Sequence, residues 1–130
     1  MPLSQKCSIE MRIAFFHIGK STVQADMFCK SVKRAFDHNV EIIQISDLET
    51  PKVEEAEKIL RSKEFNKSKI MYWRMIGYRD LLKLDPGPTV FFDTDILVTK
   101  KFKINFEGRP FICKRSYDKN KILLDHAYLN

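Results

Sequence analysis

Three short apolar runs, separated by stretches with helical patterns, restrict the folds open to this chain more than any other feature. The runs are MRIAFFH at 11–17, VEIIQI at 40–45 and TVFF at 89–92. Their Ile, Val and Phe content is typical of buried strands. Strands that alternate with helices favour a mainly parallel sheet, because parallel neighbours need a crossover connection. We therefore predict a Rossmann-like α/β fold with helices on both faces of the sheet.

Three helices are expected between these runs. The first follows Ser21-Thr-Val-Gln24, which has the Ser-x-x-Gln form of a capping box, and should end near 37–39. A second is expected over 50–60, because Pro51 suits the first position of a helix. The third spans 68–84 and stops at the Asp-Pro-Gly-Pro turn that follows.

The length and composition indicate one ordinary globular domain, residues 1–130. One more strand is expected at RPFICK, 109–114. The opening MPLSQKCSIE has no apolar signal-peptide core, and no run approaches the ~18 apolar residues of a membrane span, so a cytoplasmic location is expected. Cys7, Cys29 and Cys113 lie far apart, which predicts free, buried thiols rather than a disulfide framework or a zinc site.

The net charge of +6 is concentrated in one segment, 100–121, which holds eight basic residues against two acidic ones. Such a surface attracts the phosphates of a nucleotide, a nucleic acid or a lipid headgroup. A solvated charged face explains the same composition equally well.

The stretch AFFHIGKS, 14–21, fits the loose form of a phosphate loop, and VFFD would pass as the acidic magnesium strand of such an enzyme. However, the four residues before Gly19 are bulky and apolar, and Ala14 lies inside the apolar run rather than at its end. We therefore interpret the match as an accident of a strand running into a helix, with Lys20 a solvated lysine.

A stronger pattern is Asp93-Thr94-Asp95, which follows the third apolar run. In an extended segment residues two apart point to the same side, so both carboxylates could face one Mg²⁺ or Mn²⁺ ion. Open α/β sheets also bind ligands at the carboxyl ends of their strands. A charged strand end with two solvated aspartates is the alternative.

The segment YWRMIGYRDLLKLDPGPTVFFDTDILV, 72–98, resembles the central part of nucleotide-diphospho-sugar glycosyltransferases of the GT-A fold, especially the group with the lipopolysaccharide galactosyltransferases and glycogenin. The shared features are an aromatic-x-Arg on a helix, a short loop, an apolar strand, and Asp-x-Asp before an aliphatic run. The resemblance is looser over the first strand and helix, and ends near Lys103. It implies metal-dependent transfer of a sugar from a nucleoside diphosphate donor, with a UDP-sugar favoured, to a hydroxyl.

The same resemblance implies roles for individual residues. Asp95 would bind the Mn²⁺ or Mg²⁺ ion, Asp93 would bind the metal and the ribose, and Arg74 would face the diphosphate or sugar. The alternative for Arg74 is an exposed pair with an acid such as Asp80.

The nucleotide base would lie near the ends of the first two strands, at Phe16, His17 and Asp47. For His17 the alternative is a buried histidine with satisfied hydrogen bonds.

Enzymes of this resemblance carry a C-terminal half that builds the acceptor site, and this chain shows no counterpart to it. The sequence therefore predicts a nucleotide-binding half, with a homo-oligomer or a partner chain as ways to complete the site. A small basic nucleic-acid-binding module is the alternative, although most of the aromatic residues lie in apolar runs where packing explains them.

Overall fold

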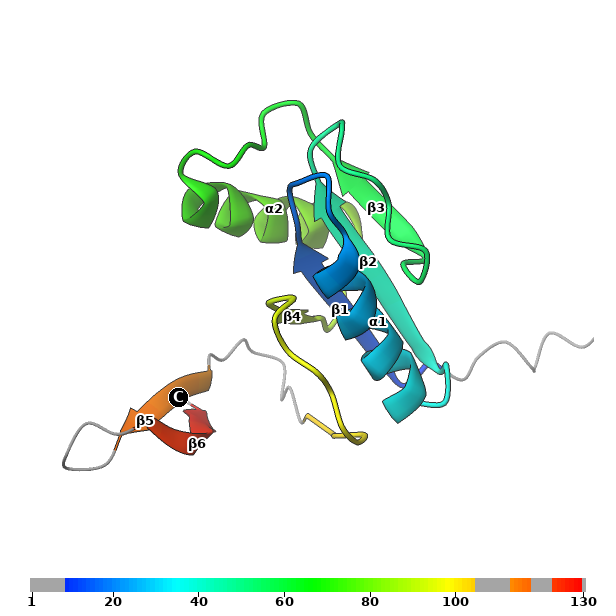
Figure 1. Ribbon diagram of the computed structural model, residues 1–130, viewed down its shortest axis with the longest axis vertical. Coiled ribbons are helices and arrows are strands. Elements are labelled where there is room, and N and C mark those ends of the chain that lie inside the picture. Colours follow the sequence, from blue (N-terminus) through cyan, green and yellow to red (C-terminus); the bar gives the residue numbers. More distant parts are fainter. Residues whose placement is uncertain (1–8, 105–112, 118–122, 130) are drawn as a thin grey trace, which may run out of the picture.

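Four parallel strands and two helices form the body of the molecule. The computed structural model describes residues 9–104, 113–117 and 123–129, the last two stretches by their backbone alone. The sheet has the order β3-β2-β1-β4, from β1 (Met11–Phe16), β2 (Val40–Ser46), β3 (Lys58–Arg61) and β4 (Val90–Phe92). The helices are α1 (Val23–Ala35) and α2 (Ile70–Leu84), as Figure 1 shows. The expected α/β character and parallel sheet are confirmed.

A separate antiparallel pair follows, made of β5 (Cys113–Tyr117) and β6 (Leu123–Leu129). The strand expected at 109–114 lies mostly outside the described residues, and its last two positions begin β5. Neither described helix combines the length and the apolar composition needed to cross a bilayer.

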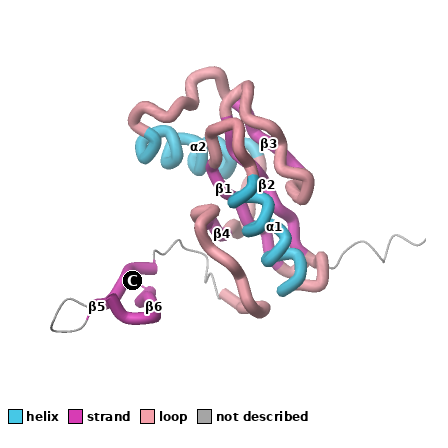
Figure 2. The backbone as a smooth tube through the Cα atoms, in the orientation of Figure 1, coloured by secondary structure: helices cyan, strands magenta, loops and turns pink. Residues whose placement is uncertain are grey.

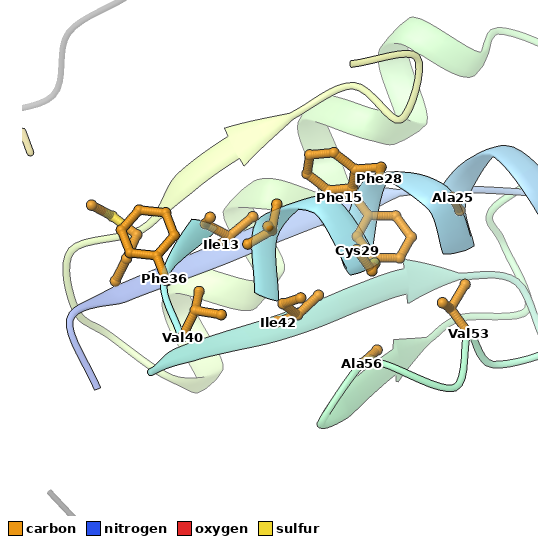
Figure 3. Close-up of a cluster of buried hydrophobic side chains, with 12 residues drawn as sticks. Ile13, Phe15, Ala25, Phe28, Cys29, Phe36, Val40, Ile42, Val53 and Ala56 are labelled. Carbon is orange, nitrogen blue, oxygen red and sulfur yellow. The ribbon is translucent and has the colours of Figure 1, made fainter. Parts of the chain in front are cut away.

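The two helices cover opposite faces of the sheet. Since side chains alternate along β1, successive residues of this strand face different helices. Ile13 and Phe15 pack with Phe28 of α1, whereas Ala14 and Phe16 pack on the other face. The α1 face contains Ile13, Phe15, Ala25, Phe28, Cys29, Val32, Phe36, Val40, Ile42, Val53 and Ala56 (Figure 3). The α2 face contains Ala14, Phe16, Ile43, Ile45, Phe65 and Leu81. Cys29 is a free, buried thiol, as expected.

A glycine lets α2 lie close against its face of the sheet. A Cβ added at Gly77 would stand 2.9 Å from Cγ2 of Ile45 and 3.3 Å from Cδ2 of Phe16. Both distances are shorter than ordinary carbon contacts, so any side chain at this position would push α2 outward.

The helix expected over 50–60 is wrong. Residues 51–57 form an irregular connection, and β3 then joins the sheet edge beside β2. The buried Gln44 explains the difference, because its side chain accepts a hydrogen bond from Val53 N at 2.6 Å and donates one to Pro51 O at 3.0 Å. Glu57 N likewise donates a hydrogen bond to Ile42 O at 2.9 Å. Backbone groups that a helix would use are thus bonded across the chain.

After β4 the chain turns back and runs alongside α1 as a loop (Figure 2). Ser31 Oγ of α1 accepts a hydrogen bond from Val98 N at 2.9 Å. The Phe102 ring packs edge-on against Phe36 and Phe92, with centroids 5.2 and 5.9 Å apart. Val98 and Phe102 of this return segment, residues 96–104, therefore pack against the core on the α1 face.

Candidate functional site

The strand order reverses between β1 and β4, and the candidate site lies at this point. Both β2 and β4 pair in parallel with β1, on opposite sides of it. Because all three strands run in the same direction, the loop after Phe16 and the turn after Phe92 emerge at the same edge of the sheet. In open α/β sheets the crevice beyond such a reversal is the usual place for a ligand.

A charged pair stands at this edge. Nη1 of Arg74, on the second turn of α2, lies 2.7 Å from Oδ1 of Asp93, the first residue after β4. The alternative partner considered for Arg74, Asp80, is instead paired with Arg79 at 3.2 Å. The two residues that the sequence assigned to one donor site are therefore neighbours, 19 positions apart in the chain. The Asp93 side chain is 57% exposed, so the pair is open to solvent.

Asp93 and Asp95 do not lie on an extended strand, which corrects the geometry expected from their spacing. The strand ends at Phe92, and Thr94 and Asp95 form a turn. β4 pairs with β1 only as far as Phe92, so the polar residues beyond it have no ladder to continue and adopt a turn, as Asp and Thr commonly do. The two carboxylates are both exposed, but simple strand alternation does not set their relative direction.

Asp95 lines an open groove of about 570 Å³ between α1 and the turn after β4. The α1 wall consists of Ser21, Val23, Gln24 and Met27, and the other wall of Thr94, Asp95, Ile96 and Leu97. Val23, Met27, Ile96 and Leu97 are among the exposed large apolar side chains of the molecule. The groove thus combines a polar end, where Thr94 Oγ1 lies 3.5 Å from Gln24 Oε1, with a mainly apolar lining.

The Ser-x-x-Gln capping box is absent. Thr22 is the residue before α1, and no side chain caps the helix. Gln24 lines the groove instead.

His17 closes the loop between β1 and α1. Its Nε2 lies 2.8 Å from the carbonyl oxygen of Ser21, and since a carbonyl only accepts, Nε2 carries the proton. The ring is half-buried and Nε2 is hydrogen-bonded to Ser21 O. His17 therefore resembles the expected alternative of a histidine with satisfied hydrogen bonds, although it is not fully buried. Beside this loop, the Lys67 ammonium lies 3.6 Å from where a Cβ on Gly19 would stand. No sequence pattern marks Lys67, because only the three-dimensional structure brings it to this loop.

The local structure of AFFHIGKS differs from that of a phosphate loop, in line with its interpretation as an accidental match. Ala14 is fully buried within β1 and pairs with Ile43 and Phe91, so the strand does not end there. Only residues 17–22 separate β1 from α1. Gly19 N also donates to Thr50 Oγ1 at 2.9 Å, which directs that N–H toward the protein rather than toward a phosphate.

Phe16 and Asp47 lie at the carboxyl ends of β1 and β2, as expected, but their side chains have local partners. The Phe16 ring is 8% exposed and packs edge-on against Phe65 at 5.4 Å, so only its backbone could contact a ligand. Asp47 Oδ1 accepts hydrogen bonds from the N–H groups of Glu49 and Thr50, at 3.2 and 2.8 Å. Partial burial raises the pKa of Asp47, but these hydrogen bonds and the charge of Arg61 outweigh it and lower the pKa overall.

Within the described residues, no three His, Cys, Asp or Glu side chains converge on one point where a metal ion could be held. This described part of the chain therefore offers a cation two exposed carboxylates at most, those of Asp93 and Asp95. Such a donor set suits Mg²⁺ or Mn²⁺ carried by a phosphorylated ligand, because these ions commonly take one or two carboxylates and complete their shell with phosphate oxygens and water. Two carboxylates do not suit a structural metal site, which usually has four protein ligands. In comparisons with known proteins, no family model, no curated protein and no solved structure matches this chain.

Proposed function

We propose that this chain is a metal-dependent, glycosyltransferase-like domain of the GT-A type that binds a nucleoside diphosphate sugar. The observation that carries the proposal is the Arg74–Asp93 pair at the reversal of strand order, with Asp95 in the next turn. A cation and a diphosphate need opposite charges on the protein, and this pair supplies both within 2.7 Å. The chemistry fits a ligand that brings its own metal ion.

In this proposal the two aspartates would bind the cation, and Arg74 would bind the diphosphate. Because Arg74 holds Oδ1 of Asp93, the second oxygen of that carboxylate is the one left for a cation. The same guanidinium places a fixed positive charge next to the diphosphate. A bound divalent ion would stabilise the negative charge that develops on the diphosphate as the bond to the sugar breaks. Asp95, across the turn, would fix the ion from the groove side.

The nucleic-acid alternative rests on the basic segment 100–121, most of which lies outside the described residues. Among its described lysines, Lys101 pairs with Glu10 at 3.0 Å. The donor-binding proposal therefore has the more direct support, since it depends on residues whose contacts are described.

A thermal-shift panel tests the proposal. UDP, GDP, CMP, ATP, a UDP-sugar and a GDP-sugar are each added with and without Mn²⁺. At 100 times its dissociation constant a ligand stabilises the folded state by about 2.7 kcal/mol, which is a shift of several degrees for a domain of this size. We expect UDP or GDP to stabilise only with Mn²⁺. A panel in which no nucleotide stabilises, or in which Mn²⁺ makes no difference, would refute the proposal.

Matched variants make the test specific. Asp95→Asn should abolish the Mn²⁺-dependent shift, whereas Asp37→Asn should retain it. Asp37 is an exposed aspartate with φ of 52°, a conformation that asparagine adopts readily. Arg74→Ala should likewise weaken nucleotide binding, and Arg79→Ala, on the same helix, should not. Equal losses in both members of either pair would count against the assigned site.

A further inference from the structure

The groove beside Asp95 differs in chemistry from the charged pair that it adjoins. Arg74 reaches the sheet edge from α2, and Lys67 reaches it from the segment that leads into α2. The groove is instead built from α1, the residue Ser21 before it and the turn after β4. Only one of the eight residues that line the groove is charged, and four are large and apolar. This lining does not favour a diphosphate, since removing water from phosphate against apolar side chains is costly.

The apolar lining is exposed to solvent. Exposure reaches 67% at Val23, 60% at Leu97 and 54% at Met27, so no described residue covers these side chains. A volume of about 570 Å³ lies within the range of small-molecule sites, which are usually apolar pockets with a few placed polar groups. The polar groups gather at the end where Thr94, Asp95 and Gln24 meet.

We propose that this groove binds a small amphipathic molecule, with its alkyl or aryl body against Met27 and Leu97 and its hydroxyl end at Asp95. Within the proposed glycosyltransferase function, on which this reading as a substrate rests, the molecule is the hydroxyl acceptor. The carboxylate accepts a hydrogen bond from the hydroxyl, and Thr94 and Gln24 add further donors and acceptors around it. An acceptor that is entirely carbohydrate fits less well, because an apolar wall offers its hydroxyls no partners.

Methionine methyl NMR tests the groove directly. The chain has five methionines, and Met27 in the groove and Met75 on α2 have similar exposure, 54% and 62%. The probe is n-octyl β-D-glucopyranoside below its micelle concentration, with glucose as the polar arm. We expect a saturable shift of the Met27 methyl with the octyl glucoside, no matching shift at Met75, and no response to glucose. Equal shifts at both methyls would mean general adsorption and would overturn the proposal, as would a response to glucose of similar strength.

Variants supply a second readout that does not depend on Met27 as the reporter. Leu97→Gln should weaken octyl glucoside binding by about tenfold in calorimetry, because apolar contact is lost on one wall. Met75→Gln, the matched control, should bind as the wild type does. Unchanged binding in Leu97→Gln would refute the assignment. Circular dichroism checks that both variants fold.

A parallel titration of the wild type with UDP and Mn²⁺ separates the two proposals. If UDP with Mn²⁺ binds but octyl glucoside does not, the groove proposal fails and the donor-binding function stands. If octyl glucoside binds selectively but UDP with Mn²⁺ does not, the groove stands as a binding site and the glycosyltransferase function fails.

Discussion

Replacing Gly77 with alanine tests how closely α2 lies on the sheet, because two effects of opposite sign compete. In an exposed helix the change would stabilise the protein by about 1 kcal/mol, since alanine is the better helix former. Here the new Cβ would stand 2.9 Å from Ile45 Cγ2 and 3.3 Å from Phe16 Cδ2, both on buried side chains. Overpacking of this kind costs about 1–3 kcal/mol, and the Ile45 methyl is fixed close to its strand, so the upper end applies. We expect a net loss of about 1–2 kcal/mol.

Urea unfolding followed by circular dichroism gives the free energy directly. The expected loss corresponds to a fall in Tm of roughly 3–10 °C. Met75→Ala, on the exposed side of the same helix, should stay within about 0.5 kcal/mol of the wild type. Because α2 carries Arg74, lifting the helix should also weaken the response to UDP and Mn²⁺. A Gly77→Ala protein that is more stable than the wild type would refute the close approach of α2.

Three further predictions follow from buried or hydrogen-bonded groups. Burial, followed by the charge of Asp26, raises the pKa of Cys29 to about 12, so iodoacetamide at pH 8 should modify this thiol only after unfolding, and rapid labelling of the native protein in peptide mapping would contradict this. The pKa of Asp47 is lowered, so its contribution to stability is present at neutral pH and lost as the pH falls below about 4; the Asp47→Ala protein should show a smaller loss over that range in urea titrations, and an unchanged pH profile would contradict it. Gln44→Leu should cost about 1–3 kcal/mol, because Val53 N loses its buried partner, and unfolding equal to the wild type would show that the connection has other support.

The elements with strong periodic patterns could be predicted from the sequence. The irregular connection at 51–57, which depends on the buried amide of Gln44, could not. The spacing of Val53, Ala56 and Leu60 suggests a helix, yet Val53 and Ala56 pack on the α1 face and Leu60 packs on the α2 face. The decisive residue is Gln44, whose amide lies inside a strand and organises the following connection. A pattern of apolar residues contains no information about where such an amide finds its partners.

The candidate site, too, could be predicted from the sequence only in part. Asp-x-Asp after an apolar strand was enough to predict that Asp93 lies at a sheet edge. That Arg74 pairs with Asp93 rather than Asp80 depends on where α2 lies, and that depends on Gly77 and on the strand order. The groove was not predicted, because its two walls come from segments about 70 residues apart, and its exposed apolar side chains resemble core positions in a sequence.

The strand order accounts for the two unlike walls around the turn after β4. Had β4 added beside β3, the preceding crossovers would have placed both helices on the same face, since such connections are right-handed. β4 would then lie about 14 Å from β1, three strand spacings away, and the amino end of α1 could not face Asp95. Placing β4 on the other side of β1 sends α2 to the opposite face. Arg74 then approaches the turn from one face, and Gln24 and Met27 approach it from the other. A charged wall and an apolar wall around one pair of aspartates therefore follow from a single topological choice.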